Sequence, residues 1–325
     1  MKKHREEIAL QEKLRKKEEK ALIQEGKDRL KEEIDKSNNV YEKLVKEFEK
    51  DHLLITNKSC YIKTLPDKNI IMSRAKMIVS YEHLVCGKNK NGDDISFIHK
   101  WISCNAEKRV KDDVDVFPNN ALCPPNIHNL WTPFRVDLLQ NKPYTPDIEG
   151  RDFVFNHIRI LCDNEDSVYD FIIKWFAQMV QFPEVKSIVP TFISKEGSGK
   201  STLLKLPTRM FGQSKILETA NPNRDVWGDF NELMIHSYFV NLSEISKKDT
   251  KDSINKIKAL ITDNSLVINN KREGKFIIKS YHRFLITTNS EDPIDTKEGD
   301  RRNFIIRSSD EKKETLNILL NLINI

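Results

Sequence analysis

The sequence has few of the residues that hold secreted or metal-stabilised domains together. Its 325 residues include five cysteines, an odd number, and no two of them form a C-x-x-C pair. The eight histidines show no metal-ligand spacing. This usage is typical of reduced thiols in an intracellular protein, and it disfavours both a disulfide framework and a zinc site.

Long apolar runs are also missing. No run approaches the roughly 18 residues that a membrane-spanning helix needs, and the N-terminal KKHREE does not resemble a signal peptide. We therefore expect a soluble, intracellular protein with no membrane partner. The net charge of +5 and the pI of about 8.7 are mildly basic, so they permit a nucleic-acid partner without predicting one.

Glycine and proline are nearly absent from the first 50 residues, which contain Gly26 as their one glycine and 28 charged side chains. This composition predicts a long charged helix. An apolar stripe with alternating steps of four and three residues follows in its second half: Leu30, Ile34, Ser37, Tyr41, Leu44 and Phe48. The stripe leaves two interpretations open. The helix is a coiled coil or docking helix that assembles subunits, or it is a solvated helix that precedes the domain.

The rest of the chain has the composition of an ordinary globular protein, and its length favours two domains. We predict a small mixed α/β domain over residues 52–150, a polar linker at 140–150 and a further α/β domain over 151–325. Four large aromatic residues mark the densest part of the first of these domains, and we interpret them as core rather than as a base-stacking platform: Trp101, Phe117, Trp131 and Phe134.

The segment 187–211 organises the second domain, because it predicts a strand, a tight loop and a helix. Six consecutive loop and helix residues have the types that a phosphate-binding loop requires: Gly197, Ser198, Gly199, Lys200, Ser201 and Thr202. The glycines let backbone N–H groups turn toward phosphate oxygens. Lys200 would reach the β- and γ-phosphates of ATP, and the Ser201 hydroxyl would ligate Mg²⁺.

Two residues depart from this pattern. Ser194 stands where the first glycine of G-x-x-x-x-G-K-[ST] belongs, so the turn must use a conformation open to non-glycine residues. Pro207 lies in the second turn of the helix, where it removes a backbone donor and clashes with a carbonyl. We therefore expect a kink or an early helix end there.

Two later strands are predicted to end in polar residues. The strand 238–242 is followed by Ser243 and Glu244, and the strand 281–287 by Thr288 and Asn289. Glu244 is placed to hold Mg²⁺ and to polarise the attacking water of a nucleotide hydrolase. Ser243 occupies the place of the usual partner acid, and Asn289 is placed to sense the γ-phosphate or to position water.

Between these strands lie a helix at 253–261 and a hairpin with strands 266–269 and 275–278. The hairpin carries Lys271, Arg272 and Lys275, which predicts either a surface that follows a nucleic-acid backbone or a solvated turn. After Asn289 the chain continues through Arg301 and Arg302, a strand at 304–307 and an apolar helix at 316–323.

The order of these motifs resembles superfamily 3 helicases, specifically the poxvirus-type primase-helicases of large DNA viruses and phages. The segments VFPNN…NLWTPF and NPNRDVWGDFN resemble parts of the same proteins. The resemblance covers about residues 52–310. It implies an AAA+-like P-loop NTPase domain with a small α/β domain and a long charged helix upstream.

The resemblance further implies a homohexameric ring that translocates on single-stranded DNA in viral or phage replication, at a replication site or in the host cytoplasm, with a primase or other replication proteins as partners. By this resemblance Glu244 is the catalytic acid, Asn289 the sensor and Arg301 or Arg302 the arginine finger. Such proteins often carry an upstream primase domain and continue past the last strand, which favours a truncated or split product here.

Three functions remain open at this stage. The first is an ATP-dependent replicative helicase. The second is an ATP-binding, DNA-binding ring or assembly factor that hydrolyses ATP weakly, because Ser243 stands where an acid is expected. The third is an unrelated P-loop NTPase such as a small-molecule kinase, which is disfavoured because no segment resembles an acceptor-substrate site.

Overall fold

A computed structural model of the chain describes residues 2–89, 91–104, 108–139, 142–143, 145–228, 230–245, 254–270, 274–291, 293 and 300–309. The chain divides into two compact units. The first comprises Met1–Leu54, Tyr61–Lys63 and Met72–Val110, and the second comprises Ile55–Cys60, Thr64–Ile71 and Lys111–Ile325. The sequence predicted domain boundaries near residues 50 and 150, and the two units do not follow them. Those domain boundaries stay a prediction.

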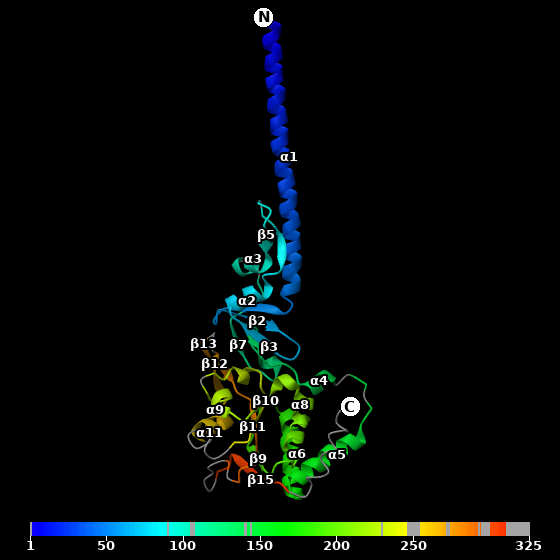
Figure 1. The fold of residues 1–325 in the computed structure, drawn as a ribbon, viewed down its shortest axis with the longest axis vertical. Helices are drawn as coiled ribbons and strands as arrows, with labels where there is room; N and C mark the ends of the chain where they lie inside the picture. The colour runs from blue at the N-terminus through cyan, green and yellow to red at the C-terminus, as the bar shows by residue number, and fades with distance from the viewer. Residues whose placement is uncertain are drawn as a thin grey trace. The chain divides into compact units, whose positions relative to one another are not determined.

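The first unit is built on the long helix α1 (Lys2–Phe48), which Figure 1 traces as one continuous rod. The predicted helix is thus confirmed. Its other elements are α2 (Arg74–Tyr81), β4 (Val85–Lys88), β5 (Asp94–Ser96) and α3 (Phe97–Ser103). Strands β4 and β5 pair in antiparallel.

Among the described side chains of α1, those of the apolar stripe near the end of the helix pack within the first unit. The Phe48 ring lies 5.2 Å from the ring of Phe97 and 5.1 Å from that of Trp101, between centroids. The Ser37 hydroxyl donates to the Cys86 carbonyl at 3.1 Å. Ile34, one turn earlier, is 49% exposed. Residues 37–48 of α1 therefore pack against other elements of the first unit. A coiled coil formed by the part of α1 before residue 37 stays a prediction.

Short strands and helices fill residues 52–139. A four-stranded sheet has the order β3-β2-β1-β6, with the strands β1 (His52–Ile55), β2 (Cys60–Thr64), β3 (Asn69–Met72) and β6 (Val110–Lys111). Then follow β7 (Asp113–Asp115), the 3-10 turn η1 (Asn120–Leu122), β8 (Ile127–Asn129) and α4 (Arg135–Leu139). Trp101, Phe117 and Phe134 are buried, and Trp131 packs against Phe134, so the interpretation of these aromatics as core is confirmed.

The second unit contains a five-stranded sheet with the order β10-β11-β14-β9-β15, and every neighbouring pair in it is parallel. Its strands are β9 (Val189–Ile193), β10 (Ile216–Thr219), β11 (Phe239–Ser243), β14 (Arg283–Thr288) and β15 (Asn303–Arg307). The predicted strands around residues 188–193, 238–242, 281–287 and 304–307 are confirmed within one or two residues at each end.

Helices pack on one face of this sheet. Besides η1 and α4, the described helical elements of the second unit are α5 (Ile148–Leu161), α6 (Asp166–Gln181), α7 (Lys200–Leu203), α8 (Lys205–Phe211), α9 (Pro222–Asp225), α11 (Ile254–Thr262) and the 3-10 turns η2 (Gln213–Lys215) and η3 (Glu232–Ile235). Side chains of α5, α6, α7 and α8 share a core with Phe192, Phe239, Leu285 and Ile306 of the strands. The parallel sheet and its helices make this a mixed α/β fold.

Two sequence predictions about these helices have clear outcomes. The Asp147 side chain accepts a hydrogen bond from the Gly150 N–H at 2.8 Å and so caps α5. The predicted linker at 140–150 is therefore wrong in its last three residues, because this cap starts the helix inside it. The expected break near Pro207 is confirmed, since α7 ends at Leu203 and α8 begins at Lys205.

The predicted hairpin is confirmed as β12 (Ser265–Asn270) and β13 (Gly274–Lys279), which pair in antiparallel from Ser265 opposite Lys279 to Asn270 opposite Gly274. Its tip, residues 271–273, and the predicted helix at 316–323 lie outside the described residues. Among the helices that the structure describes, none has the length and apolar character needed to cross a membrane.

Candidate functional site

Three strands of the parallel sheet end side by side at its carboxyl edge. Thr288 at the end of β14 lies opposite Ile193 at the end of β9, and Ser243 at the end of β11 lies opposite Thr287. The chain leaves β9 toward β10 on one side of the sheet, and after β14 it crosses to β15 on the other. Open parallel sheets bind ligands at the carboxyl edge where the strand order reverses in this way.

Lys200 lies at the centre of this edge. Its Nζ is 2.5 Å from the Asn289 Oδ1, 2.7 Å from the Ser194 carbonyl oxygen and 3.3 Å from the Lys195 carbonyl oxygen. The side chain is 9% exposed. Burial lowers the pKa of Lys200, and the nearby carboxylates of Glu244 and Glu196 oppose that shift. The structure thus brings together the predicted lysine at the start of α7, the acid that follows β11 and the amide that follows β14.

The segment 194–199, which we call the glycine loop, connects β9 to α7. Gly197 and Gly199 have φ of 82° and 94°, which glycine adopts without strain. A Cβ at Gly197 would meet no atom within 4 Å, so the loop faces open space there. Helix α7 has only four residues, so the loop amides and Lys200, rather than a long helix dipole, make this edge attractive to anions.

Ser194 shows how the loop forms without its first glycine. Its φ is not positive, because the non-glycine residues with positive φ in the described chain are Ser59, Asp163, Asn164 and Glu244. The buried Ser194 hydroxyl lies 2.5 Å from the Ser198 hydroxyl and 3.0 Å from Lys200 Nζ. The serine therefore links both ends of the loop to the lysine, which a glycine could not do.

Glu244 follows β11 in a left-handed conformation with φ of 53° and is exposed. Its N–H donates to the Thr287 carbonyl at 2.7 Å. Such a conformation costs a non-glycine residue about 1–3 kcal/mol, and such strain clusters at functional sites. Ser201, the other predicted metal ligand, is exposed on α7, and the adjacent Thr202 is half-buried.

Thr288 is a buried residue whose role the sequence did not reveal. Its hydroxyl donates to the Ile245 carbonyl at 2.8 Å and accepts from the Ser290 N–H at 3.0 Å. Its own carbonyl accepts from the Ser194 N–H at 3.1 Å. One side chain and its peptide therefore tie together the segments that carry Glu244, Asn289 and the glycine loop.

His157 on α5 is a second residue that sequence reasoning missed. It is buried, and its Nε2 lies 3.0 Å from the Gly199 carbonyl oxygen. Burial lowers the pKa of His157, although the hydrogen bond to Gly199 opposes the shift. Its partner is a backbone carbonyl 42 residues away, which has no sequence signature.

The two predicted finger arginines lie at the other edge of the sheet. Asn303, directly after Arg302, lies opposite Val189 at the start of β9, and the Val189 N–H donates to the Arg302 carbonyl at 2.8 Å. The length of β9, about 16 Å for five residues, separates them from the glycine loop of the same chain. Arg301 is exposed, whereas Arg302 lies 3.7 Å from the Asp300 carboxylate.

Arg307 lies instead at the carboxyl edge, a position that the sequence did not predict. It is opposite Ile193, and its Nη1 lies 2.5 Å from a carboxylate oxygen of Glu291, two residues after Asn289. Both side chains are largely exposed. Arg307 therefore adds a second cation beside the glycine loop.

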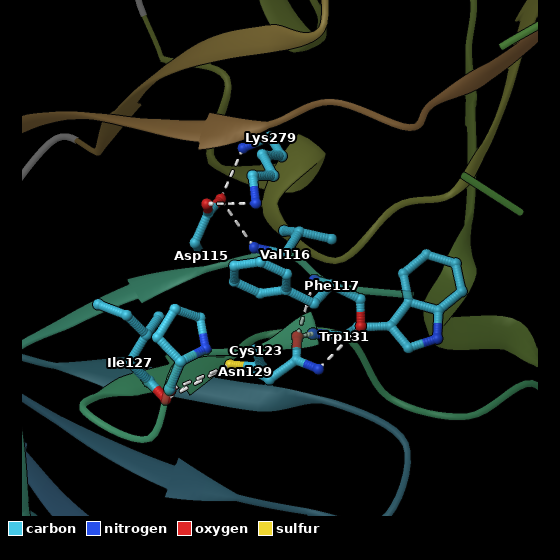
Figure 2. Close-up of polar contacts among 9 residues, drawn as sticks. Asp115, Val116, Phe117, Cys123, Ile127, Asn129, Trp131 and Lys279 are labelled. Atoms are coloured by element: carbon cyan, nitrogen blue, oxygen red, sulfur yellow. Dashed lines mark hydrogen bonds and ion pairs between the residues drawn. The ribbon is translucent and has the colours of Figure 1, made fainter. Parts of the chain in front are cut away.

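The hairpin is fixed to the second unit through its stem. The Asn231 amide donates to the Val267 carbonyl at 2.9 Å, and its oxygen accepts from the Asn269 N–H at 2.8 Å. Figure 2 shows the other stem strand, where the Lys279 N–H donates to Asp115 at 2.7 Å. The Lys279 ammonium lies 3.6 Å from the centre of the Phe117 ring.

Of the three predicted DNA-contacting residues, the structure places one. Lys275 on β13 is exposed, whereas Lys271 and Arg272 lie outside the described residues. The residues that the structure describes include no group of three or more His, Cys, Asp or Glu side chains arranged to hold a metal ion. None of the five cysteines, all of which lie in the described part of the chain, forms a disulfide there.

Comparisons with known proteins place these features in context. Residues 192–302, about a third of the chain, match a family model described as a family of unknown function, DUF5906. The chain is 29% identical over 189 residues to the DNA primase-polymerase of Nitratiruptor phage NrS-1. That alignment covers 57% of this chain and 25% of the phage protein.

Two solved structures of the NrS-1 C-terminal region in its apo state share the fold. One has a TM-score of 0.63 at 21% identity and covers 87% of this chain and 66% of that one. The other, an A form, has a TM-score of 0.60 at 22% identity and covers 85% and 62%. The present chain therefore spans about a quarter of the phage protein and somewhat less than two thirds of its solved C-terminal region.

Proposed function

We propose that this chain binds and hydrolyses ATP at the glycine loop, with Mg²⁺ as cofactor. The observation that carries the proposal is the buried Lys200 ammonium, held between the Ser194 carbonyl and the Asn289 amide. Glu244 lies close enough to act on its charge. A lysine, a carboxylate and an amide at the end of a parallel sheet are the groups that phosphoryl transfer to water requires.

Lys200 binds and stabilises the transferred phosphoryl group. Its present partners are neutral oxygens of Ser194, Lys195 and Asn289. Phosphate oxygens are charged and are stronger acceptors, so the ammonium exchanges its neutral partners for them when the triphosphate enters. Because Asn289 is one of the partners released, its amide becomes available to the γ-phosphate or the attacking water.

The residues present also fit Mg²⁺. The Ser201 hydroxyl and the Glu244 carboxylate are oxygen ligands of the kind that Mg²⁺ prefers, and two protein ligands leave room for phosphate and water, as is usual for this ion. When bound, the ion neutralises charge on the β- and γ-phosphate oxygens. The Glu244 carboxylate, exposed at the end of β11, accepts a proton from the attacking water.

We further propose that this hydrolysis drives a superfamily 3 DNA helicase. The hairpin, whose stem is fixed to the second unit, has three positively charged residues in its sequence. These are Lys275 on β13 and, before it, Lys271 and Arg272, and we propose that all three contact DNA. Arg301 is exposed at the edge opposite the glycine loop, which suits a hexameric ring in which each site borrows an arginine from its neighbour. The similarity to a phage DNA primase-polymerase supports a role in phage DNA replication on single-stranded DNA.

We also propose a primase or another replication protein as a partner, since the relative is a DNA primase-polymerase of which the alignment covers a quarter. Ser243 favours a second candidate, a ring that binds ATP and DNA but hydrolyses ATP weakly. It is half-buried at the place where a second metal-binding acid is expected, so the site has one carboxylate fewer.

Two substitutions test the hydrolytic site. Lys200→Ala is expected to abolish ATP hydrolysis, whereas Glu244→Gln should keep ATP binding and lose turnover. Binding would be measured by calorimetry and turnover by phosphate release. Glu196→Gln is the matched control, because Glu196 also acts on the charge of Lys200 but is exposed within the glycine loop. Equal turnover in the two glutamine variants would contradict the assignment of Glu244 as the acid.

A further inference from the structure

A narrow apolar cavity lies directly beside the glycine loop. Its volume is about 90 Å³. Phe153, Val154 and Ile158 of α5 form one wall, and Thr202, Leu203 and Leu206 of α7 and α8 form the other. The wall residues of α5 recur at helical spacing, so one face of this helix lines the cavity. We call this cavity the base slot.

The base slot is joined to the glycine loop by a direct contact. His157 lines the slot and its Nε2 bonds to the Gly199 carbonyl oxygen at 3.0 Å, which fixes α5 against the loop. Thr202, on the opposite wall, is two residues after Lys200. In a loop of this type the lysine contacts the β- and γ-phosphates while the amides that follow reach the α-phosphate. The nucleoside end of a bound nucleotide would therefore leave the loop on the Thr202 side.

We propose that the base slot binds the nucleobase of the nucleotide and prefers adenine through His157. This inference rests on the proposed function, because it assumes a triphosphate on the glycine loop. The half-buried Phe153 ring and the aliphatic walls offer a planar base the apolar contact that such sites use. A phosphate chain alone would need none of them.

The hydrogen bond of His157 also sets its tautomer in the slot, whose lining includes the charged residues Lys205 and Arg209 as well. Because Nε2 faces a carbonyl oxygen, it must carry the proton, and Nδ1 is then an acceptor. Among the described residues, Nδ1 of His157 has no hydrogen-bond partner. An acceptor in the wall pairs with an exocyclic amine, which adenine has and hypoxanthine replaces with a carbonyl. The slot should thus favour ATP over inosine triphosphate by about 2- to 12-fold, the value of one hydrogen bond.

The test compares the dissociation constants of Mg²⁺-ATP, Mg²⁺-inosine triphosphate and Mg²⁺-tripolyphosphate, measured by calorimetry on the full chain. Phe153→Ala is expected to weaken ATP binding by roughly 5- to 100-fold, the loss seen when an aromatic partner of a base is removed. Tripolyphosphate binding should stay unchanged. Val154→Phe puts a larger side chain into the slot and removes no contact. It should also weaken ATP binding and leave tripolyphosphate binding unchanged. Phe155→Ala is the matched control, because Phe155 is 39% exposed on the same helix and does not line the slot.

The outcomes separate this inference from the proposed function. If Phe153→Ala and Val154→Phe leave the ratio of ATP to tripolyphosphate affinity at its wild-type value, the base slot is wrong although the phosphate site stands. If the wild-type chain prefers inosine triphosphate, the role of His157 is wrong. If it binds neither ATP nor tripolyphosphate, the proposed function fails and the inference falls with it.

Discussion

Thr288 connects the three loops of the candidate site at the scale of a single residue. Its hydroxyl bonds to the Ile245 carbonyl and the Ser290 N–H, next to Glu244 and Asn289 in the chain. The side chain is 1% exposed, so water cannot replace these bonds. We therefore regard Thr288 as a positioning residue for the acid and the amide.

Thr288→Val keeps the shape of the side chain and removes the hydroxyl. We expect it to cost about 1–3 kcal/mol of stability, because a buried carbonyl loses its donor. Turnover should fall by about 10- to 100-fold, as small displacements of catalytic groups do, while ATP binding through Lys200 persists. Thr262→Val is the matched control, since its exposed hydroxyl donates to the Lys258 carbonyl on α11. Unchanged turnover in Thr288→Val would contradict the positioning role.

Lys215 offers a pH-dependent test at the same scale. It is 4% exposed, and its ammonium lies 4.4 Å from the centre of the Trp131 ring. Burial lowers the pKa of Lys215 to about 7, with Asp67 opposing the shift. The unfolded chain keeps this proton up to about pH 10.4, so unfolding takes up a proton between about pH 7 and 10. The free energy of unfolding therefore rises with pH in that window. Below it, the folded chain carries the full cost of burying the charged Lys215 ammonium.

Lys215→Met should remove this penalty. The variant is expected to be more stable than the wild type at pH 6.5, and the difference should shrink by up to about 1.4 kcal/mol for each pH unit above 7. Urea unfolding at pH 6.5, 8 and 9.5 measures it, and comparing two proteins at each pH cancels the other titrating groups. A stability difference that does not vary with pH would show that Lys215 is not buried as described.

At the scale of elements, local sequence predicted most of what positions the site. The strand, loop and helix at 187–211, the strands ending near Glu244 and Asn289, and the hairpin all follow from apolar runs and glycines, which act locally. The early start of α5 was missed because the Asp147 cap lies in a segment that looks like a linker.

The supporting residues could not be predicted from the sequence. His157 and Thr288 bond to backbone carbonyls more than 40 residues away, and a carbonyl is present at every residue. The placement of Arg307 at the loop edge, and of Arg302 at the opposite edge, depends on the register of β15 against β9. Register is a property of the folded sheet, so the sequence alone did not place Arg302 and Arg307 at opposite edges.

The hairpin makes a prediction at this scale. Replacing Lys271, Arg272 and Lys275 by Ala should weaken single-stranded DNA binding and lower the slope of log affinity against log salt by about 2, because each phosphate contact contributes about 0.7. Binding would be measured by fluorescence anisotropy at several salt concentrations. The control replaces Lys27, Lys31 and Lys36 on the exposed face of α1, which removes the same charge. An equal change of slope in both triple variants would contradict a specific DNA contact of the hairpin and would favour the solvated turn.

At the scale of the whole molecule, the position of Arg301 predicts an active site shared between subunits. Arg301 is exposed at the sheet edge opposite Lys200, while Arg302 lies beside Asp300. Neither arginine can reach the glycine loop of its own chain across the length of β9. A finger arginine contributes on the order of 10³-fold or more to turnover, so its absence should be easy to detect.

A mixing experiment examines this sharing. A double Arg301→Ala, Arg302→Ala variant and a Lys200→Ala variant should each be inactive alone. Mixed rings contain interfaces with an intact lysine on one side and intact arginines on the other, so mixing should restore measurable ATPase activity. The single Arg301→Ala variant should behave like the double one. Absence of recovery, with mixed rings seen by negative-stain imaging, would count against a shared site.

The central claim is that ATP hydrolysis at the glycine loop is coupled to single-stranded DNA, and single-turnover ATPase of the full chain with and without that DNA tests it most directly. We predict hydrolysis that is accelerated by single-stranded DNA and abolished in both conditions by Lys200→Ala. A weak rate that DNA leaves unchanged would favour the ATP-binding ring over the motor. Hydrolysis that survives in Lys200→Ala would contradict the account outright.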